Sequence, residues 1–512
     1  MMKNLFVVLL GVGFMASCNR DSDNNNAQGS ELSSAEAGLR HYDPSQLEKD
    51  FTPMNESTSI SGKAGSQLNY TFRGYANPVE VAHPDGSHST VDLAASAVFQ
   101  VDDIIFVAWH TNDYAALNAT APTPGTVAGS LCAYRLSGIG QYELMDRVDF
   151  EQHDLYGLAA YRNPNSGNIE VMVTGQRNTD DSQYVLSRHE GAIVARMDYD
   201  YINDEFWEAS LKELPLVGVA GTGIIALGAQ YFVTTGNGIG GRGGVFQVNR
   251  ALRTVIEAKL MEEIIDIQVD PTTVNKNGGD FYILCRGGQN LYIDKFSYNR
   301  TVSEKWNPSL YYYIAMNRDY DLVGNNWKYD GDGDDIKPVP QAKGHLVIAQ
   351  GRTATTLKRD SMLINYGDNK GFIYKANGGN KFNGSVPVSP VMTIIDTAMS
   401  MGNFSAITFD PILGVLYCGG GEDSPGNAGL SVIAMGEYSG DEEILDPKPL
   451  VATHHLVGKL VLPSAVNTFD HLGFPVIENL GLKAINDISV YNGRNIAVSV
   501  GDKGLMFIQK DD

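Results

Sequence analysis

Short apolar runs rich in β-branched and aromatic residues recur along most of the chain, and polar or glycine-bearing turns separate them. A run, a turn and a second run form a unit that occurs seven times, and helical periodicity of any length is hard to find. Residues 66–512 are therefore predicted to be an all-β fold made of repeated antiparallel units. The first runs are Ile104–Trp109, Ile169–Thr174, Gln230–Thr235, Phe281–Cys285, Ser361–Tyr366, Gly414–Cys418 and Asn495–Val500, and the second runs are Leu131–Leu136, Ala192–Met197, Gly244–Val248, Asn290–Phe296, Gly371–Lys375, Leu430–Met435 and Gly504–Gln509.

Another strand-like run precedes most of these pairs, as Ala97–Val101 and Ile485–Tyr491 do. Each unit is then a sheet of three or four antiparallel strands. One small sheet cannot bury both of its faces, but seven sheets arranged radially can, and that arrangement is a seven-bladed β-propeller. Two stacked β-sandwich domains are the alternative, although they would not explain a register that all seven units share.

The two ends of this region predict how the ring closes. The last unit stops at Gln509, just after its third strand, and lacks an outer strand. The strand-like stretch Gln67–Tyr75 precedes the first unit, and pairing it with the last unit would remove an open edge. Two insertions, at residues 297–343 and 437–482, lengthen the spacing between units, and we expect functional loops there.

The last unit reads Ile-Ala-Val-Ser-Val-Gly-Asp-Lys-Gly-Leu-Met-Phe-Ile from Ile496 to Ile508. It resembles the LVIVD or YVTN type of propeller repeat, in which a strand is followed by Gly-Asp, Gly-Leu and a β-branched run. Gly371–Tyr374 and Gly429–Ile433 match it best among the other units. The resemblance implies a propeller fold and a surface location, and it implies no reaction.

Residues 1–17 are typical of an export signal, because Lys3 precedes an apolar stretch, Leu5–Met15, that is too short to span a bilayer. The run Met15-Ala16-Ser17-Cys18 resembles a bacterial lipobox, although that family prefers Leu where Met15 stands. The resemblance implies cleavage before Cys18 and lipid on its thiol. An ordinary secretory signal that happens to contain a cysteine is the alternative.

The residue after Cys18 is Asn19 and not the Asp that usually retains such lipoproteins at the inner membrane. The resemblance therefore implies an outer-membrane location, facing the periplasm or the cell surface. Residues 18–65 are rich in Ser, Asn, Asp and Gly, and we predict a flexible polar tether.

The charge of the chain limits the classes of molecule that it could bind. With 38 Lys and Arg against 60 Asp and Glu, the net charge is −22, which excludes nucleic acid as a natural partner.

Besides Cys18, only Cys132, Cys285 and Cys418 remain, each in an apolar strand-like run. They are predicted to be buried free thiols, because a disulfide framework would need more cysteines in pairs.

In a propeller, the turns between second and third strands lie on the same side as the links between blades. That rule gathers polar side chains from every unit, including a set of cations in a strongly acidic chain. Guanidinium groups suit carboxylate or phosphate, so an anionic ligand such as an acidic sugar is one interpretation, and internal pairing is the other. The predicted ligand residues are Arg177, Arg242, Arg286, Asn178, Asp368, Glu422 and Asp502.

His110, His153 and Asp154 are the catalytic candidates: His153 could act as a base that the adjacent Asp154 orients, and His110 lies in a turn on the same face. No serine in a nucleophile setting accompanies them. A histidine next to a strand end is otherwise a structural hydrogen-bonding residue.

The carboxylates Asp330, Asp332 and Asp334 alternate with glycines and could wrap one Ca²⁺ ion, the only cofactor that the sequence suggests. The loop resembles the start of an EF-hand. Asp335 stands where that loop needs Gly, and Gln341 stands where it needs Glu, so a calcium loop of another kind or a solvated acidic loop is expected.

Two functions follow from these features. The first is a lipid-anchored cell-envelope propeller that acts as a non-catalytic binding or scaffold module for a glycan, a peptide or a partner protein. The second is a propeller lyase or hydrolase acting on an anionic polysaccharide or a lactone. The enzyme would need His110 or His153 close to Arg177 or Arg286.

Overall fold

A computed structural model of the 512-residue chain contains strands and turns throughout the part that it describes. The all-β prediction is confirmed for these residues, in which no helix occurs and none could therefore cross a membrane. The described residues are 39–41, 51–61, 67–82, 90–111, 129–136, 142–151, 153–177, 191–218, 220–227, 230–236, 243–253, 255–261, 263–269, 275–287, 290–300, 308–315, 336–338, 345–349, 371–375, 392–394, 404–410, 412–413, 415–420, 429–435, 454–463, 465–469, 475–479, 485–501 and 503–511.

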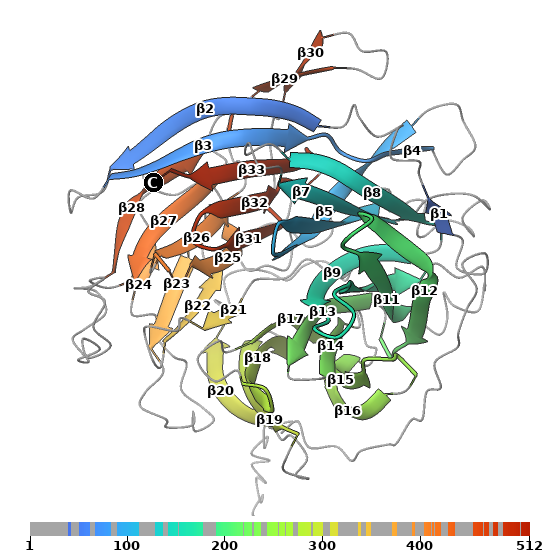
Figure 1. Ribbon diagram of the computed structural model, residues 1–512. Helices are drawn as coiled ribbons and strands as arrows, with labels where there is room; N and C mark the ends of the chain where they lie inside the picture. The colour runs from blue at the N-terminus through green and yellow to red at the C-terminus, as the bar shows by residue number, and fades with distance from the viewer. Residues whose placement is uncertain are drawn as a thin grey trace, which may run out of the picture.

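Antiparallel sheets of four to six strands follow one another along the chain, and we number them in chain order (Figure 1). Sheet 1 contains β1 Leu39–His41, β4 Glu80–Ala82, β5 Thr90–Val101, β6 Ile104–Thr111, β7 Gly129–Leu136 and β8 Tyr142–Phe150. Sheet 2 contains β9 His153–Arg162, β10 Ile169–Arg177, β11 Ala192–Asp200 and β12 Glu205–Pro215. Sheet 3 contains β13 Ala220–Leu227, β14 Gln230–Gly236, β15 Gly243–Asn249 and β16 Val255–Met261.

The second half of the chain repeats this order. Sheet 4 contains β17 Glu263–Val269, β18 Gly278–Gly287, β19 Asn290–Asn299 and β20 Pro308–Ala315. Sheet 5 contains β21 Ile336–Pro338, β22 His345–Ala349, β23 Gly371–Lys375 and β24 Met392–Ile394. Sheet 6 contains β25 Phe404–Asp410, β26 Val415–Gly420, β27 Gly429–Met435 and β28 His454–Val461. Sheet 7 contains β2 Phe51–Ser61, β3 Gln67–Ala76, β31 Asp487–Tyr491, β32 Asn495–Ser499 and β33 Leu505–Lys510, and β29 Ala465–Phe469 pairs with β30 Pro475–Asn479 as a separate hairpin.

We call β5, β9, β13, β17, β21, β25 and β31 the first strands of sheets 1 to 7, and we count the second, third and fourth strands outward from them. The first strand of each sheet contacts the first strand of the next sheet. These contacts run from β5 through β9, β13, β17, β21 and β25 to β31, and β31 contacts β5. First strands therefore lie at the centre and fourth strands at the rim, which is the arrangement of a β-propeller. We call the side with the turns between first and second and between third and fourth strands the turn face, and the opposite side, which carries the links between sheets, the link face.

A one-residue bulge interrupts the first strand of several sheets. The pairing skips Ser96 in β5, Tyr156 in β9, Thr222 in β13, Ile265 in β17 and Ser405 in β25. A bulge bends its strand and redirects one side chain. The Ser96 hydroxyl uses this position to donate to the Leu155 carbonyl of sheet 2, 2.7 Å away, so the bulge joins two sheets.

The apolar core is divided into layers between neighbouring sheets. Phe106 and Leu131 of sheet 1 pack with Val171 of sheet 2 in one layer. Similar layers lie between sheets 2 and 3, 3 and 4, 6 and 7, and 7 and 1. Sheets 1, 2, 3 and 7 thus each bury both faces by having a neighbour on either side.

The N-terminal segment adds strands to two sheets. Tyr70–Ala76 of β3 pairs antiparallel with Leu505–Lys510 of β33. Strand β2 pairs with β3, and β1 pairs with β8 of sheet 1. Part of the predicted 18–65 tether, Phe51–Ser61, is therefore an outer strand in the structure, with Ile60 buried and the Phe51 ring packed 5.6 Å from that of Phe507.

Two further expectations differ in detail. In sheet 5 the strand that pairs with β23 is β22, His345–Ala349, whereas the expected run Ser361–Tyr366 lies outside the described residues. The expected insertions also contain sheet strands: residues 297–343 include β20 and β21, and residues 437–482 include β28 and the β29–β30 hairpin. Pairing partners far along the chain decide these positions, and the local pattern does not show them.

Candidate functional site

His110 and Asp154 approach each other where sheets 1 and 2 meet on the link face. His110 is the last residue but one of β6 and Asp154 is the second residue of β9; they are 2% and 0% exposed. The His110 Nδ1 atom lies 4.0 Å from Asp154 Oδ1, too far for a hydrogen bond. Asp154 Oδ2 accepts a 2.5 Å hydrogen bond from the Tyr156 hydroxyl, and the His110 ring meets the Tyr156 ring edge-on at 5.6 Å. His110 and Asp154 are therefore neighbours inside the protein, whereas the pair predicted from the sequence was His153 with Asp154.

His153 forms a second buried pair. Its Nε2 atom lies 3.1 Å from Glu213 Oε1 of β12, within ion-pair distance although the orientation makes no hydrogen bond. His153 is 0% exposed, and its ring stacks edge-on against Phe150 at 5.7 Å. Glu213 was not among the residues expected from the sequence, because it lies 60 residues after its partner on a different strand of the sheet.

The predicted ligand set is only partly placed. Arg177 is the last residue of β10, with its Cα opposite that of His153, and Arg286 lies in β18 opposite Glu263. The side chains of both arginines lie outside the described part. Asn178, Arg242, Asp368, Glu422 and Asp502, the calcium candidates Asp330, Asp332 and Asp334, and the lipidation candidate Cys18 all lie outside the described residues.

The described residues also bear on the cysteine and metal predictions. Cys132 and Cys418 are buried free thiols, as predicted. Within the same residues, no three His, Cys, Asp or Glu side chains come together in a way that could hold a metal ion.

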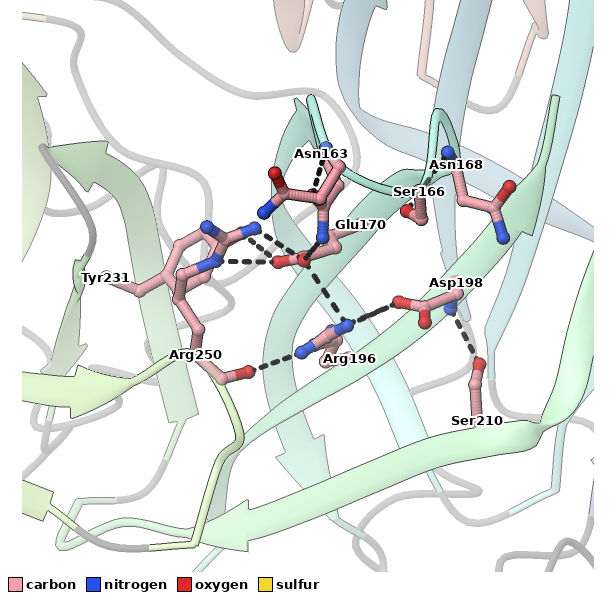
Figure 2. A network of polar contacts seen from close by, with 10 residues as sticks. Asn163, Ser166, Asn168, Glu170, Arg196, Asp198, Ser210, Tyr231 and Arg250 are labelled. Atoms are coloured by element: carbon pink, nitrogen blue, oxygen red, sulfur yellow. Dashed lines mark hydrogen bonds and ion pairs between the residues drawn. The ribbon is translucent and has the colours of Figure 1, made fainter.

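A buried carboxylate joins sheets 2 and 3 on the turn face (Figure 2). Glu170 of β10 is 3% exposed and accepts hydrogen bonds from Arg250 Nη2 at 2.5 Å and Arg250 Nε at 3.0 Å. Asn163 Nδ2 donates to it at 2.9 Å, the Tyr231 hydroxyl donates at 3.3 Å, and Arg196 Nη2 lies 3.4 Å away. Because Glu170 holds donors from two sheets, the network fixes their relative position.

The Arg196 guanidinium extends this network. It donates to Asp198 Oδ1 at 2.7 Å through Nη2 and to the Arg250 carbonyl at 2.7 Å through Nη1. The Arg250 guanidinium lies 4.7 Å above the Tyr161 ring centroid. Both arginines are thus occupied by protein groups, and the network is structural.

A second network on the turn face joins sheets 7, 1 and 2. Arg162 binds Asp102, which also accepts a 3.3 Å hydrogen bond from the Tyr491 hydroxyl. Tyr201 donates to Asp103 at 2.7 Å, and Arg135 Nη2 lies 2.6 Å from Asp204 Oδ1. The sequence shows only scattered charges at these turns, because the partners come from three sheets.

No known family model matches the sequence, and no curated protein matches it either. Solved structures resemble the fold at low identity. Kuenenia stuttgartiensis hydrazine synthase shares 12% identity over 84% of this chain and 99% of that one, with a TM-score of 0.45. The WD40 β-propeller domain of Doa1 shares 11% over 86% and 98%, with a TM-score of 0.38. YCF48 bound to a D1 peptide shares 10% over 89% and 98%, with a TM-score of 0.39. Such likeness carries no function to this chain.

Proposed function

We propose that residues 66–512 form a seven-bladed propeller that the N-terminal strand β3 closes. The supporting observations are the seven multi-stranded sheets, the circuit of contacts between first strands and the β3–β33 pairing. Polar contacts between sheets 7 and 1 add to this. The Ala95 carbonyl accepts from Asn486 Nδ2 and Ser499 Oγ, each at 2.7 Å, and the Ala95 amide donates to the Gly501 carbonyl at 2.9 Å.

We infer that this propeller is a non-catalytic binding or scaffold module. The observation that carries the inference is the burial of His110, His153 and Asp154, which are 2%, 0% and 0% exposed. A general base must come within hydrogen-bond reach of its substrate, and no solute reaches these groups without opening the interface between sheets 1 and 2. The link-face turns are then the part available for recognition, since loops on a rigid scaffold commonly carry binding.

The ligand we propose for the link face is anionic, such as an acidic glycan, and it engages Arg177, Arg242 and Arg286. The test is a glycan binding screen with a chain that begins at residue 19, followed by titrations at two salt concentrations. Arg286→Ala should weaken binding of an acidic hit more than Lys370→Ala, and Arg286→Lys should restore only part, because lysine lacks the guanidinium fork. A neutral hit, or binding indifferent to all three arginines, would contradict this assignment.

We propose that the protein is located at the outer membrane and is anchored there by lipid on Cys18. The lipobox-like segment Met15–Cys18 supports it. Metabolic labelling with a fatty-acid analogue should mark the protein, and Cys18→Ala should lose the label and leave the membrane fraction. Label that persists in Cys18→Ala would rule the anchor out.

A further inference from the structure

The end of the β11–β12 hairpin of sheet 2 presents an exposed tryptophan. Residues directly opposite each other on paired antiparallel strands have side chains on the same face. Tyr199 and Phe206 are such a pair, and both are buried toward sheet 1, with their rings 5.2 Å apart. The next pair, Asp198 and Trp207, lies on the opposite face, where Trp207 is 56% exposed. Ile202, in the turn that joins the two strands, is 86% exposed, so one hairpin offers two apolar side chains to a partner.

The backbone that carries the tryptophan is fixed by hydrogen bonds. The Ser210 hydroxyl accepts from the Asp198 amide at 2.7 Å and donates to the Trp207 carbonyl at 2.5 Å. The neighbouring Phe206 amide donates to the buried Asp146 carboxylate of sheet 1 at 2.6 Å. A partner that binds the Trp207 ring therefore does not have to order this strand first, and such preorganisation lowers the cost of binding.

Charge decides which partner fits this surface. The segment Asp198–Glu208 contains five carboxylates and no Lys or Arg. Arginines of the protein bind two of them, Asp198 and Asp204. Asp200 and Glu205 are directly opposite each other, and neither has an ion-pair partner among the described residues. Like charges in opposite positions repel, so a cation placed beside this pair would stabilise it.

Asp200 keeps its negative charge although it accepts hydrogen bonds. Its donors are the Ile202 amide at 2.9 Å, the Asn203 amide at 3.2 Å and Asn203 Nδ2 at 2.8 Å, all of them neutral groups. The hydrogen bond from the Ile202 amide is the largest cause that lowers the pKa of the carboxyl, which therefore stays ionised under ordinary conditions. Arginine fits such a surface best, because its planar guanidinium stacks on aromatic rings and pairs with carboxylates, whereas lysine is a point charge.

We propose that the end of the β11–β12 hairpin docks an arginine-bearing segment of a partner protein. The guanidinium stacks on the Trp207 ring and pairs with Asp200 and Glu205, and an apolar neighbour of the arginine contacts Ile202. This site goes beyond the proposed link-face site, because it lies on the turn face and selects the opposite charge. The module would then hold an anionic ligand and a cationic partner on opposite sides, and a failed glycan screen would leave this proposal unaffected.

The test uses a chain that begins at residue 19 and a fluorescein-labelled peptide, Gly-Arg-Leu-Arg-Gly. Versions with Lys or Glu in place of Arg are compared by fluorescence polarisation at two salt concentrations. The arginine peptide should bind more tightly than the lysine peptide, and the glutamate peptide should not bind. Trp207→Ala should lower the affinity for the arginine peptide about threefold, and Trp207→Phe should retain most of it. Glu205→Gln should also lower it about threefold, with a smaller loss at the higher salt concentration.

Matched variants separate this site from general charge and from unfolding. Glu56→Gln with Glu80→Gln removes two exposed carboxylates of sheets 7 and 1 and should leave the affinity unchanged. Glu205→Gln relieves the repulsion with Asp200, so it should lose binding without a fall in Tm. The proposal would be overturned by unchanged affinity in Trp207→Ala, by a loss in the control pair as large as in Glu205→Gln, by a lysine or glutamate peptide that binds as tightly as the arginine peptide, or by no binding to the wild type.

Discussion

The hydroxyl groups of Tyr70 and Tyr417 lie 3.1 Å apart and share a hydrogen bond between β3 of sheet 7 and β26 of sheet 6. Both side chains are 0% exposed, and their rings meet edge-on at 6.4 Å. Burial raises the pKa of Tyr70 to about 12 and raises that of Tyr417 as well, so both hydroxyls remain protonated donors under ordinary conditions. The N-terminal strand is therefore attached to a sheet with which it does not pair.

Removing one of these hydroxyls should cost more than removing both. Tyr70→Phe or Tyr417→Phe leaves a buried hydroxyl without its partner and should lower the free energy of unfolding by about 1–3 kcal/mol. The double variant loses the bond but leaves no hydroxyl without a partner, so it should cost less than either single variant and therefore less than their sum. Urea unfolding of the four proteins gives the coupling, and strict additivity would mean that the bond is energetically unimportant.

Asp410 should make stability depend on pH. Burial raises the pKa of its carboxyl, Oδ1 accepts from the Ile412 and Leu413 amides, and Oδ2 has no partner among the described residues. Because the pKa is higher in the folded state, the stability that protonation gives is full below the unfolded pKa of about 3.9 and is lost as pH rises through the raised value.

Asp410→Asn keeps the accepting oxygen and removes the buried charge. We expect a higher Tm than wild type at pH 7 and a difference that shrinks toward pH 4. Thermal unfolding at several pH values measures this difference. Asp200 is a partly exposed turn carboxylate whose pKa is lowered by the Ile202 and Asn203 amides, so Asp200→Asn should show the opposite sign. A difference in Tm between Asp410→Asn and the wild type that does not vary with pH would contradict a raised pKa for Asp410.

Glu170 should be among the most sensitive polar positions in the described chain. Glu170→Gln leaves Arg250 and the partly buried Arg196 without their shared carboxylate, and breaking such a buried pair costs about 3–5 kcal/mol. Asp198→Asn, which removes a more exposed partner of Arg196, should cost about 1 kcal/mol or less. Denaturant unfolding ranks the two, and equal losses would show that burial does not decide the outcome.

Truncation at the N-terminus should show graded losses. Deleting residues 19–61 removes β1 and β2 and uncovers one side of β3, so stability should fall measurably. Deleting through Ala76 removes β3, leaves the β33 edge unpaired and should cause aggregation. Thermal unfolding with light scattering separates the two, and identical curves would argue that β3 does not close the ring.

The acidic loop should bind calcium weakly if Asp330, Asp332 and Asp334 act as ligands. We expect a Kd on the order of 10⁻⁴–10⁻³ M, the range of extracellular calcium modules. Millimolar calcium should then raise the Tm, since the ion binds only the folded chain, and Asp332→Ala should abolish the rise. An unchanged Tm in the wild type would exclude the site.

Most strands were predictable from the sequence because their apolar runs are buried on both faces. Val171 and Val173 of β10 and Met172 between them are all buried, and such runs are visible without knowledge of the partner strand. Strand β2 was missed because it lies at an edge: Pro53, Asn55, Glu56 and Ser57 are partly or fully exposed, which is the composition of a tether.

The candidate site was harder to predict. Sequence reasoning took His153 and Asp154 as a base and its orienting carboxylate. It could not show that His110 also lies 4.0 Å from Asp154 or that a second sheet covers these groups, since burial depends on residues far apart in the chain. The Glu170 network has no local signal at all. Four of the five bulges do have one, because a hydroxyl residue precedes Ala or Gly in Ser96-Ala97, Tyr156-Gly157, Thr222-Gly223 and Ser405-Ala406, whereas the bulge at Ile265 precedes Asp266.

The pairing of β3 with β33 also dictates an order of events during folding. Thr71 donates its hydroxyl to Asp511, 440 residues later, so one edge of β3 pairs early with β2 whereas its other edge has no partner until almost the whole chain has been made. The entropic cost of closing so long a loop grows only with the logarithm of its length, whereas the search for the partner is slow. Sheets 1 to 6 can form before β33 is available, and until then the β33 side of Gln67–Ala76 is an unpaired edge. A variant that folds slowly at sheet 7 would therefore accumulate as an open, self-associating ring with normal inner sheets.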